Sequence, residues 1–285
     1  MDIIVLSDVH GNYVALEQCI KYAEDMEINT FVFLGDYLGE LAYPQKTMEI
    51  LYCLADKYNC HFIRGNKEDY WLNYRINCEK GWRDKDSTTG SLLYTYNNLT
   101  EKDISFFQGL QYKGKIDIEG MPQITICHGS PDSTNKKLLP NNDSTFESMG
   151  NNENKIILCG HTHVQCKIEH NGKIALNPGS VGVSLHGAGK AQFMILHGQN
   201  SNWSEEFISI DYDVEKVIYD LHNSGLSESA PYWCKITEHL LLTGEISHGS
   251  VLARAMKYCN EDKGFCNWPD IPEIYWEKAV KEMII

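Results

Sequence analysis

The sequence predicts an α/β protein built on two sheets, and two observations support this fold class. In the first half, apolar strand-like runs alternate with segments of helical periodicity, a pattern typical of βαβ crossovers and a largely parallel sheet. In the second half, strand-like runs follow one another closely, which predicts a second sheet of mixed or antiparallel strands. A chain of 285 residues can bury about three quarters of the surface that its unfolded form exposes, enough for one large domain or two modest ones.

The first half provides three expected strands and two expected helices. The strands lie at 2–7, 30–35 and 60–65, and the helices at 12–26 and 44–58. Residues 70–110 are aromatic and polar without a strand period. We therefore expect helices there, with an excursion over one face of the sheet that could form a cap or lid.

The second half provides the strands of the other sheet and then a helical tail. Five runs predict strands, and the Asn171-Gly172 pair between two of them is a strong hairpin turn signal. From Asp213 onward the apolar residues recur at helical spacing. The runs are QITICHG, KIILCGH, VQCKIEH, KIALNPG and AQFMILHG.

Composition restricts the environment and the partners. The formal net charge of −14 disfavours a stable complex with nucleic acid, because an acidic surface repels a phosphate backbone. No stretch approaches the roughly 20 apolar residues of a membrane span, and the short apolar run before Asp8 does not resemble a secretory signal. The ten cysteines include no C-x-x-C pair, which favours reduced thiols. We expect a cytoplasmic protein in which an anionic substrate meets a local positive centre.

Five motifs place polar side chains directly after apolar strands, usually beside glycine. Side chains at i and i+2 of an extended segment point the same way, so Asp8 with His10, and His161 with His163, can converge on one ion. The motifs are SDVHGN (Asp8, His10), LGDYLG (Asp36), RGNKED (Asn66), CHGSP (His128) and CGHTH (His161, His163).

The residue types in these motifs indicate a transition-metal site. Carboxylate, amide and imidazole ligands together suit Mn, Fe or Zn better than Ca, and the absence of cysteine argues against a structural zinc site. Seven candidate ligands exceed what one tetrahedral ion needs. Two ions about 3.5 to 4 Å apart, sharing one carboxylate, would use them all and could clamp the attacking and leaving oxygens of a phosphoryl transfer.

The ordered set D-x-H, G-D, G-N, H-G and G-H-x-H, followed by NPGSVG at 177–182, resembles the calcineurin-like metallophosphoesterases, most of all their compact prokaryotic phosphodiesterase branch. The resemblance runs from residue 1 to about 213, which leaves 214–285 as a helical extension packed on the core. It implies a four-layer αββα sandwich of two mixed sheets, with the site at the carboxyl ends of the strands. It also implies hydrolysis of a phosphodiester or phosphomonoester by a hydroxide that bridges two metals.

The resemblance also assigns the ligands. Asp8, His10 and His163 would bind the first metal, and Asn66, His128 and His161 the second. Asp36 would bridge the two ions, while Asp36, Asn66 and His128 would serve catalysis. The ions would be divalent transition metals, with Mn²⁺ favoured over Fe, Zn, Ni or Co.

One position departs from the family pattern. Many members read G-N-H-(D/E), with a histidine that contacts the phosphate or protonates the leaving group, whereas this chain reads GNKE and has Lys67 there. A lysine in the first turn of a helix is usually solvated, although its cation could also touch a phosphate oxygen. Protonation of the leaving group therefore has no assigned donor.

Other residues have two interpretations each. Asn12 could cap the following helix or contact substrate, and His186, after NPGSVG, could reach the substrate or stay exposed. Glu68 could orient a neighbouring group or lie exposed. An aromatic cluster could stack a nucleobase, although near-helical spacing favours packing; it comprises Tyr70, Trp71, Tyr74 and Trp82. The remaining histidines, including His222, His239 and His248, show no ligand spacing, and no catalytic group is expected in 214–285.

These observations leave three functional hypotheses. The first is a metal-dependent phosphoesterase acting on a small phosphorylated substrate, which could be a nucleotide. The second is a protein or dinucleoside polyphosphate phosphatase, because those enzymes share the DVHGN opening. The third is a scaffold that retains the fold without activity. Under each of the three hypotheses, the extension could also support a homo-oligomer.

Overall fold

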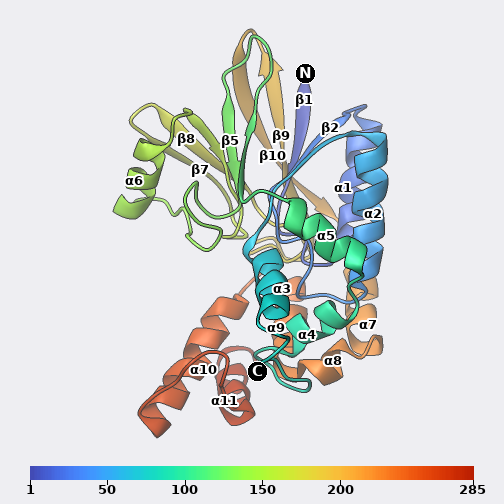
Figure 1. Ribbon diagram of the computed structural model, residues 1–285, viewed down its shortest axis with the longest axis vertical. Coiled ribbons are helices and arrows are strands. Elements are labelled where there is room, and N and C mark those ends of the chain that lie inside the picture. Colours follow the sequence, from blue (N-terminus) through green and yellow to red (C-terminus); the bar gives the residue numbers. More distant parts are fainter.

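Two five-stranded mixed sheets form the centre of the computed structural model, which describes residues 1–285 (Figure 1). The first sheet has the strand order β10-β9-β1-β2-β3. Its β1, β2 and β3 run parallel, and β9 and β10 are antiparallel neighbours. The strands are β1 (Asp2–Leu6), β2 (Thr30–Phe33), β3 (Asn59–Phe62), β9 (Lys190–Gln199) and β10 (Asn202–Asp211).

The second sheet has the order β4-β5-β6-β8-β7. Its three inner strands run parallel, and each edge strand pairs antiparallel with its neighbour. The turn at Asn171-Gly172 joins β7 to β8, as the sequence predicted. The strands are β4 (Lys113–Ile116), β5 (Ile124–Cys127), β6 (Ile156–Leu158), β7 (Gln165–His170) and β8 (Lys173–Pro178).

Side chains of β1 alternate between two apolar cores, because neighbours on a strand point to opposite faces. Ile4 and Leu6 pack toward the helices on the outer face of the first sheet. Ile3 and Val5 belong to the core between the two sheets, with residues such as Leu176 of β8. The stacked layers confirm the predicted α/β sandwich of two mixed sheets.

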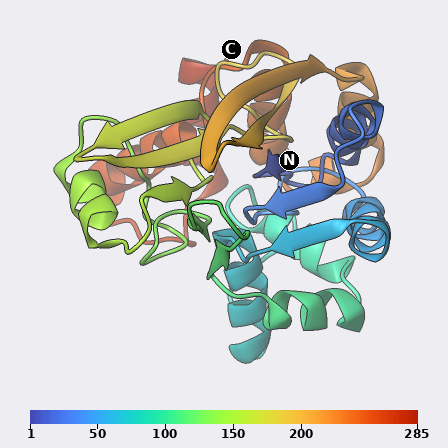
Figure 2. The same ribbon diagram turned by 90° about the horizontal axis from the view of Figure 1, so that it is seen from above.

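Helices cover the outer face of each sheet. Four helices contribute most of the helical residues in the core of the first sheet, a fifth adds Leu92, and one helix packs on the second sheet. Figure 2 shows α1 and α2 in blue on one flank and α6 in light green on the other. The helices are α1 (Tyr13–Asp25), α2 (Pro44–Lys57), α3 (Asn66–Ile76) and α5 (Glu101–Gly109), and, on the second sheet, α6 (Asp143–Asn151).

The C-terminal helices gather at the end of the sandwich where the parallel strands end. Figure 1 shows the start of β1 at the top of the molecule and these helices at the bottom. Their apolar core includes Tyr13 and Val14 of α1 and Val183, so the extension packs directly on the sandwich. The remaining helices are α4 (Gly90–Asn97), α7 (Val214–Asn223), α8 (Leu226–Ser229), α9 (Pro231–Thr243), α10 (His248–Lys263) and α11 (Glu273–Met283).

The structure adds elements that the sequence pattern did not predict. They are the edge strands β4 and β10 and the helix α6. Residues 70–110, expected to contain helices, form the end of α3 together with α4 and α5. None of the eleven helices combines the length and the apolar character needed to cross a bilayer.

Candidate metal centre

The seven predicted metal ligands come together in space. Each one lies shortly after a strand of one of the two sheets, at the carboxyl end of the sandwich. Six lie in the loops after β1, β2, β5 and β6, and Asn66, which follows β3, is the first residue of α3. Open α/β sheets bind ligands at this edge.

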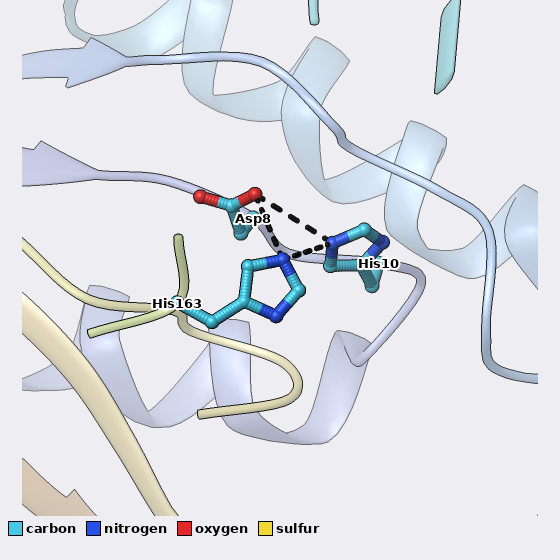
Figure 3. A group of neighbouring side chains, drawn as sticks. All are labelled: Asp8, His10 and His163. Atoms are coloured by element: carbon cyan, nitrogen blue, oxygen red, sulfur yellow. Dashed lines mark hydrogen bonds and ion pairs between the residues drawn. The ribbon is translucent and has the colours of Figure 1, made fainter. Parts of the chain in front are cut away.

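A first group combines Asp8, His10 and His163, whose side chains point toward one another in Figure 3. Asp8 Oδ1 lies 3.2 Å from His163 Nε2 and 3.6 Å from His10 Nε2. The two Nε2 atoms are 3.1 Å apart. Three ligand atoms therefore face one small volume.

A second group combines Asp8, Asp36 and His128. His128 Nε2 lies 3.5 Å from Asp36 Oδ1 and 3.0 Å from Asn66 Oδ1. The His161 ring stands 5.1 Å from the His128 ring, centroid to centroid. This group adjoins the first.

Two carboxylates connect the groups. Asp36 directs Oδ1 toward His128 and Oδ2 toward His10, at 3.5 and 3.8 Å. Asp8 Oδ1 belongs to both groups, because it also lies 3.9 Å from His128 Nε2. This arrangement has the form expected for two ions that share a carboxylate.

The backbone at this centre is left-handed rather than extended. Five of the seven predicted ligands have positive φ, between 51° and 67°, and they are Asp8, His10, Asp36, His161 and His163. The extended backbone expected for Asp8 with His10 and for His161 with His163 is therefore absent, although their side chains converge as predicted. Asp and His tolerate this region better than most residues, but each such position costs about 1–3 kcal/mol. Such strain persists only where the surrounding fold imposes it.

Contacts at Nδ1, two hydrogen bonds and one ion pair, fix the orientation of three histidine rings. His128 Nδ1 donates to Leu34 O at 2.7 Å, and His163 Nδ1 donates to Val183 O at 3.1 Å. His10 Nδ1 contacts the carboxylate of Glu40. With Nδ1 engaged, each ring can present the lone pair of Nε2 to the centre, which is how most metal-binding histidines are held.

The surroundings of one buried oxygen, Oδ1 of Asp8, indicate that a cation binds between the two groups. Asp8 is fully buried, and its Oδ2 accepts hydrogen bonds from Ser7 Oγ and from the His161 backbone at 2.5 and 2.9 Å. Its Oδ1 has no hydrogen-bond partner. A buried carboxylate oxygen without a donor is costly, and a metal ion among these Nε2 atoms would satisfy it. The mixed oxygen and imidazole donors suit a divalent transition metal.

The electrostatic field of the centre attracts positive charge. Burial alone lowers the pKa of His10, but the carboxylates of Glu40, Asp8 and Asp36 outweigh burial and raise the pKa to about 10. For His128, burial also acts downward, while Asp36 and Asp8 raise the pKa to about 9. The same negative field that holds these protons would hold a divalent ion.

Glu40 is a site residue that the sequence analysis missed. It is buried, and its carboxylate lies between His10 Nδ1 and Lys67 Nζ, the latter at 2.6 Å. In the sequence, only its position four residues after Asp36 connects Glu40 with the metal motifs. Lys67 is buried as well, so the expectation of a solvated lysine was wrong.

Glu68 holds the loop that carries Asp36. Its carboxylate accepts hydrogen bonds from the backbone N–H groups of Asp36, Tyr37 and Gly65, at 2.8 to 3.0 Å. Burial and the charge of Asp36 raise the pKa of Glu68 to about 7. Of its two interpretations, the structure supports the one in which it orients a neighbouring group.

A cleft of about 170 Å³ opens onto the centre. One side carries predicted ligands, among them His10, Asp36 and His163, together with Lys67. The exposed Lys137 also lines the cleft. The other side comes from the C-terminal extension, which supplies Trp233, Leu240, Ser247, His248 and Gly249.

The remaining candidates lie outside this cleft. Asn12 caps α1 by accepting from Ala15 N at 3.0 Å and donates to Gly182 O at 2.9 Å, which confirms the capping role. His186 is exposed on its loop. The aromatic cluster packs internally: the Tyr74 and Trp82 rings stack at 3.9 Å, and Trp71 is fully buried.

Comparisons with known proteins agree with one another. The family model described as the calcineurin-like phosphoesterase superfamily domain matches residues 1–201. An uncharacterized protein of Methanocaldococcus jannaschii is 26% identical over 246 residues, which cover 79% of this chain and 94% of that protein.

Solved structures share the fold. A hypothetical protein from Pyrococcus horikoshii aligns with a TM-score of 0.72 at 21% identity, over 86% of this chain and 99% of its own. A metallophosphoesterase from Sphaerobacter thermophilus aligns with a TM-score of 0.66 at 22% identity, over 83% of this chain and 100% of its own.

Proposed function

Because the chain belongs to the calcineurin-like phosphoesterase superfamily, we propose that it is a dimetal-dependent enzyme that hydrolyses a phosphodiester or a phosphomonoester. The observation that carries this proposal is the meeting of two ligand groups at Asp8 and Asp36, with the buried Oδ1 of Asp8 lacking a donor. A single structural ion would leave part of this set without a role.

The ligands divide between two ions. Asp8, His10 and His163 would hold the first ion, and Asn66, His128 and His161 the second, with Asp36 between them. When bound, such a pair of ions acidifies a water to give the nucleophile and neutralises the phosphoryl oxygens. We propose Mn²⁺ as the ion, with Fe, Zn, Ni or Co as alternatives that the same donors accept.

The chain itself contributes orientation and charge. Glu40 holds the His10 ring through Nδ1, while Lys67 pairs with Glu40 and offsets its buried charge. The ammonium group of Lys137, exposed at the cleft, can attract a phosphate in a protein whose net charge is −14. An anionic substrate would thus meet positive charge at the centre.

The test combines metal content with activity. Protein loaded with Mn²⁺ should contain close to two ions per chain by elemental analysis and should cleave members of a panel of diesters, monoesters and nucleotides. Asp36→Asn should weaken the binding of both ions and reduce turnover by several orders of magnitude. Asp56→Asn, at an exposed position of α2, is the matched control and should change neither.

Each alternative function has its own outcome in this test. Turnover confined to phosphopeptides or dinucleoside polyphosphates would support those phosphatase activities. Two bound ions without turnover of any ester would support a metal-binding scaffold. Loss of a single ion in Asp36→Asn would place Asp36 at one metal only and contradict the bridging role.

The cysteines bear on the location of the protein in the cell. The ten cysteines are free, and we propose a cytoplasmic location, because thiols stay reduced there. Small phosphorylated compounds, including nucleotides, are the partners that the panel tests. A homo-oligomer is the remaining expectation, and sedimentation of the purified protein would decide it.

A further inference from the structure

One wall of the cleft onto which the candidate ligands open comes from the C-terminal extension. Trp233 and Leu240 of α9, with Ser247 and His248 at the start of α10, face the same cleft as His10 and Asp36. The extension lies beyond the match to the family model, which ends at residue 201. This part of the lining therefore comes from outside the matched domain.

Trp233 is held rigidly in this wall. Its ring packs at 4.5 Å from the His248 ring and at 5.8 Å from the Trp276 ring, centroid to centroid. His248 Nε2 and Thr237 Oγ1 form a hydrogen bond of 2.8 Å. Trp233 is about nine-tenths buried within the apolar core that joins the extension to the sandwich. The indole has little freedom to move aside.

Trp233 also lies close to the candidate metal centre. Lys67 Nζ is 5.6 Å from the centroid of the Trp233 ring and 2.6 Å from Glu40, which contacts His10. A group attached to a phosphate held at the centre would meet this ring after a short distance. The Trp233 ring and the candidate metal ligands therefore enclose the same small space.

The size of that space restricts the substrate. The cleft has a volume of about 170 Å³, whereas pockets for larger organic ligands span about 300–1,000 Å³. We propose that Trp233 limits the size of the group esterified to the phosphate, so that the substrate is a small phosphate ester whose organic part is no larger than one ring. This inference rests on the proposed function and restricts its substrate class, since nucleotides, in which a sugar ring carries a base, are then excluded, as are phosphoproteins.

The experiment compares esters that differ in size alone. Nitroaryl esters with leaving groups of matched pKa, one with a single ring and one with two fused rings, are assayed as monoesters and as methyl diesters with Mn²⁺. The native protein should favour the single ring in kcat/KM by about 10-fold or more, a discrimination typical of pocket size. Trp233→Ala should bring this ratio close to one, and Trp233→Phe should give an intermediate ratio.

Binding without turnover gives a second measurement. Dissociation constants of phenylphosphonate and naphthylphosphonate, measured by calorimetry on the metal-loaded protein, should show the same preference and the same loss of it in Trp233→Ala. Trp203→Phe is the matched control, because Trp203 lies on β10, packs against the core between the two sheets and does not line the cleft. It should lower stability and leave both ratios unchanged.

The outcomes separate the two proposals. Absence of metal-dependent turnover of every ester by the native protein would overturn the proposed function. Turnover of one-ring and two-ring esters at equal kcat/KM would overturn the size limit alone. The size limit would also be overturned if the kcat/KM ratio of one-ring to two-ring esters were unchanged in Trp233→Phe. The same holds for an unchanged ratio in Trp233→Ala, provided that circular dichroism shows this variant to be folded.

Discussion

His10 and His128 hold protons at the positions where metal ions would bind. Their pKa values in the metal-free protein are about 10 and about 9, because nearby carboxylates outweigh the opposing effect of burial. Both rings are then charged at neutral pH, and they stabilise the metal-free fold until the pH rises through about 9 to 10. A metal ion needs the neutral ring, so its binding must release these protons.

Metal affinity should consequently rise with pH. We expect the association constant for Mn²⁺ to increase about tenfold per pH unit for each proton released between pH 6 and 8. Calorimetric titrations in buffers of different ionisation enthalpy would count the protons. An affinity that is flat over this range, with no proton released, would show that both rings are already neutral.

Lys67 occupies the position of the histidine in the G-N-H-(D/E) pattern that this sequence resembles. Its ammonium group pairs with buried Glu40 at 2.6 Å, and the cleft residue His248 hydrogen-bonds Thr237. We therefore expect the leaving group to depart largely as an anion, so that rates depend steeply on the pKa of the leaving group. A general acid typically supplies a factor of about 10² to 10⁴, mostly for poor leaving groups.

Aryl esters should therefore be cleaved far faster than alkyl esters of similar size. The measurement is the slope of log kcat/KM against leaving-group pKa for a series of esters. Lys67→His should flatten this slope if the ring reaches the leaving oxygen. Equal aryl and alkyl rates in the native protein, with chemistry rate-limiting, would identify another group as the acid.

At the scale of elements, the close approach of the loops after β2 and β3 depends on Gly65. A Cβ at Gly65 would overlap Asp36 Oδ1 and lie 2.5 Å from the Asp36 backbone nitrogen. We expect Gly65→Ala to displace Asp36, to lower the free energy of unfolding by about 1–3 kcal/mol and to weaken the binding of both ions.

The matched control for this change is Gly150→Ala in α6. A Cβ at Gly150 meets no atom within 4 Å, so this variant should keep metal binding and gain up to about 1 kcal/mol from helix propensity. Urea unfolding and Mn²⁺ titration measure both variants. Full metal affinity in Gly65→Ala would mean that the loops can separate without cost.

Sequence patterns predicted the elements with strong periodicity and the ends of the strands. The helices expected at 12–26 and 44–58 are α1 and α2, and the metal motifs lie where the strands stop. β10 was missed because its exposed residues alternate with partly buried ones, and β4 because its run KGKI is short and polar. Weak apolar patterns of this kind are decided by pairing partners elsewhere in the chain.

The site was predictable in its ligands and not in its supporting contacts. Asp8 or His161 can be recognised from a short motif because metal chemistry restricts the residue type. Glu40 and Trp233 have no motif, since their roles come from contacts with residues distant in the sequence or from a cleft that only the folded chain forms. The left-handed backbone at five ligands likewise depends on tertiary hydrogen bonds rather than on local preference.

At the scale of the molecule, the extension and the sandwich share one apolar core. Tyr13, Leu41 and Val183 of the sandwich pack in the same cluster as Trp276. We expect a single cooperative unfolding transition, because removing the extension would expose this surface. Chelation of the metal should shift the whole transition to lower urea, since bound ions stabilise only the native state.

Fluorine-labelled tryptophan would report on the unfolding of the sandwich and of the extension in one experiment. The ¹⁹F signals of Trp71, which packs beside the first sheet, and of Trp276, in the extension, should disappear at the same urea concentration. Loss of the Trp276 signal at lower urea than that of Trp71 would show that the extension unfolds independently.

The pairing of β1 with β9 also determines when the protein can mature in the cell. Asp2 pairs with His197, 195 residues later, and the loop of Asp8 is braced by Ser180 and Gly182. At translation rates of about 5–20 residues per second, β1 waits about 10 to 40 seconds for this partner. During that time the nascent chain carries an open strand edge, exposed to aggregation or chaperone capture. If the protein binds the proposed ions, we expect metal loading to be a late event in biosynthesis, after most of the chain has left the ribosome.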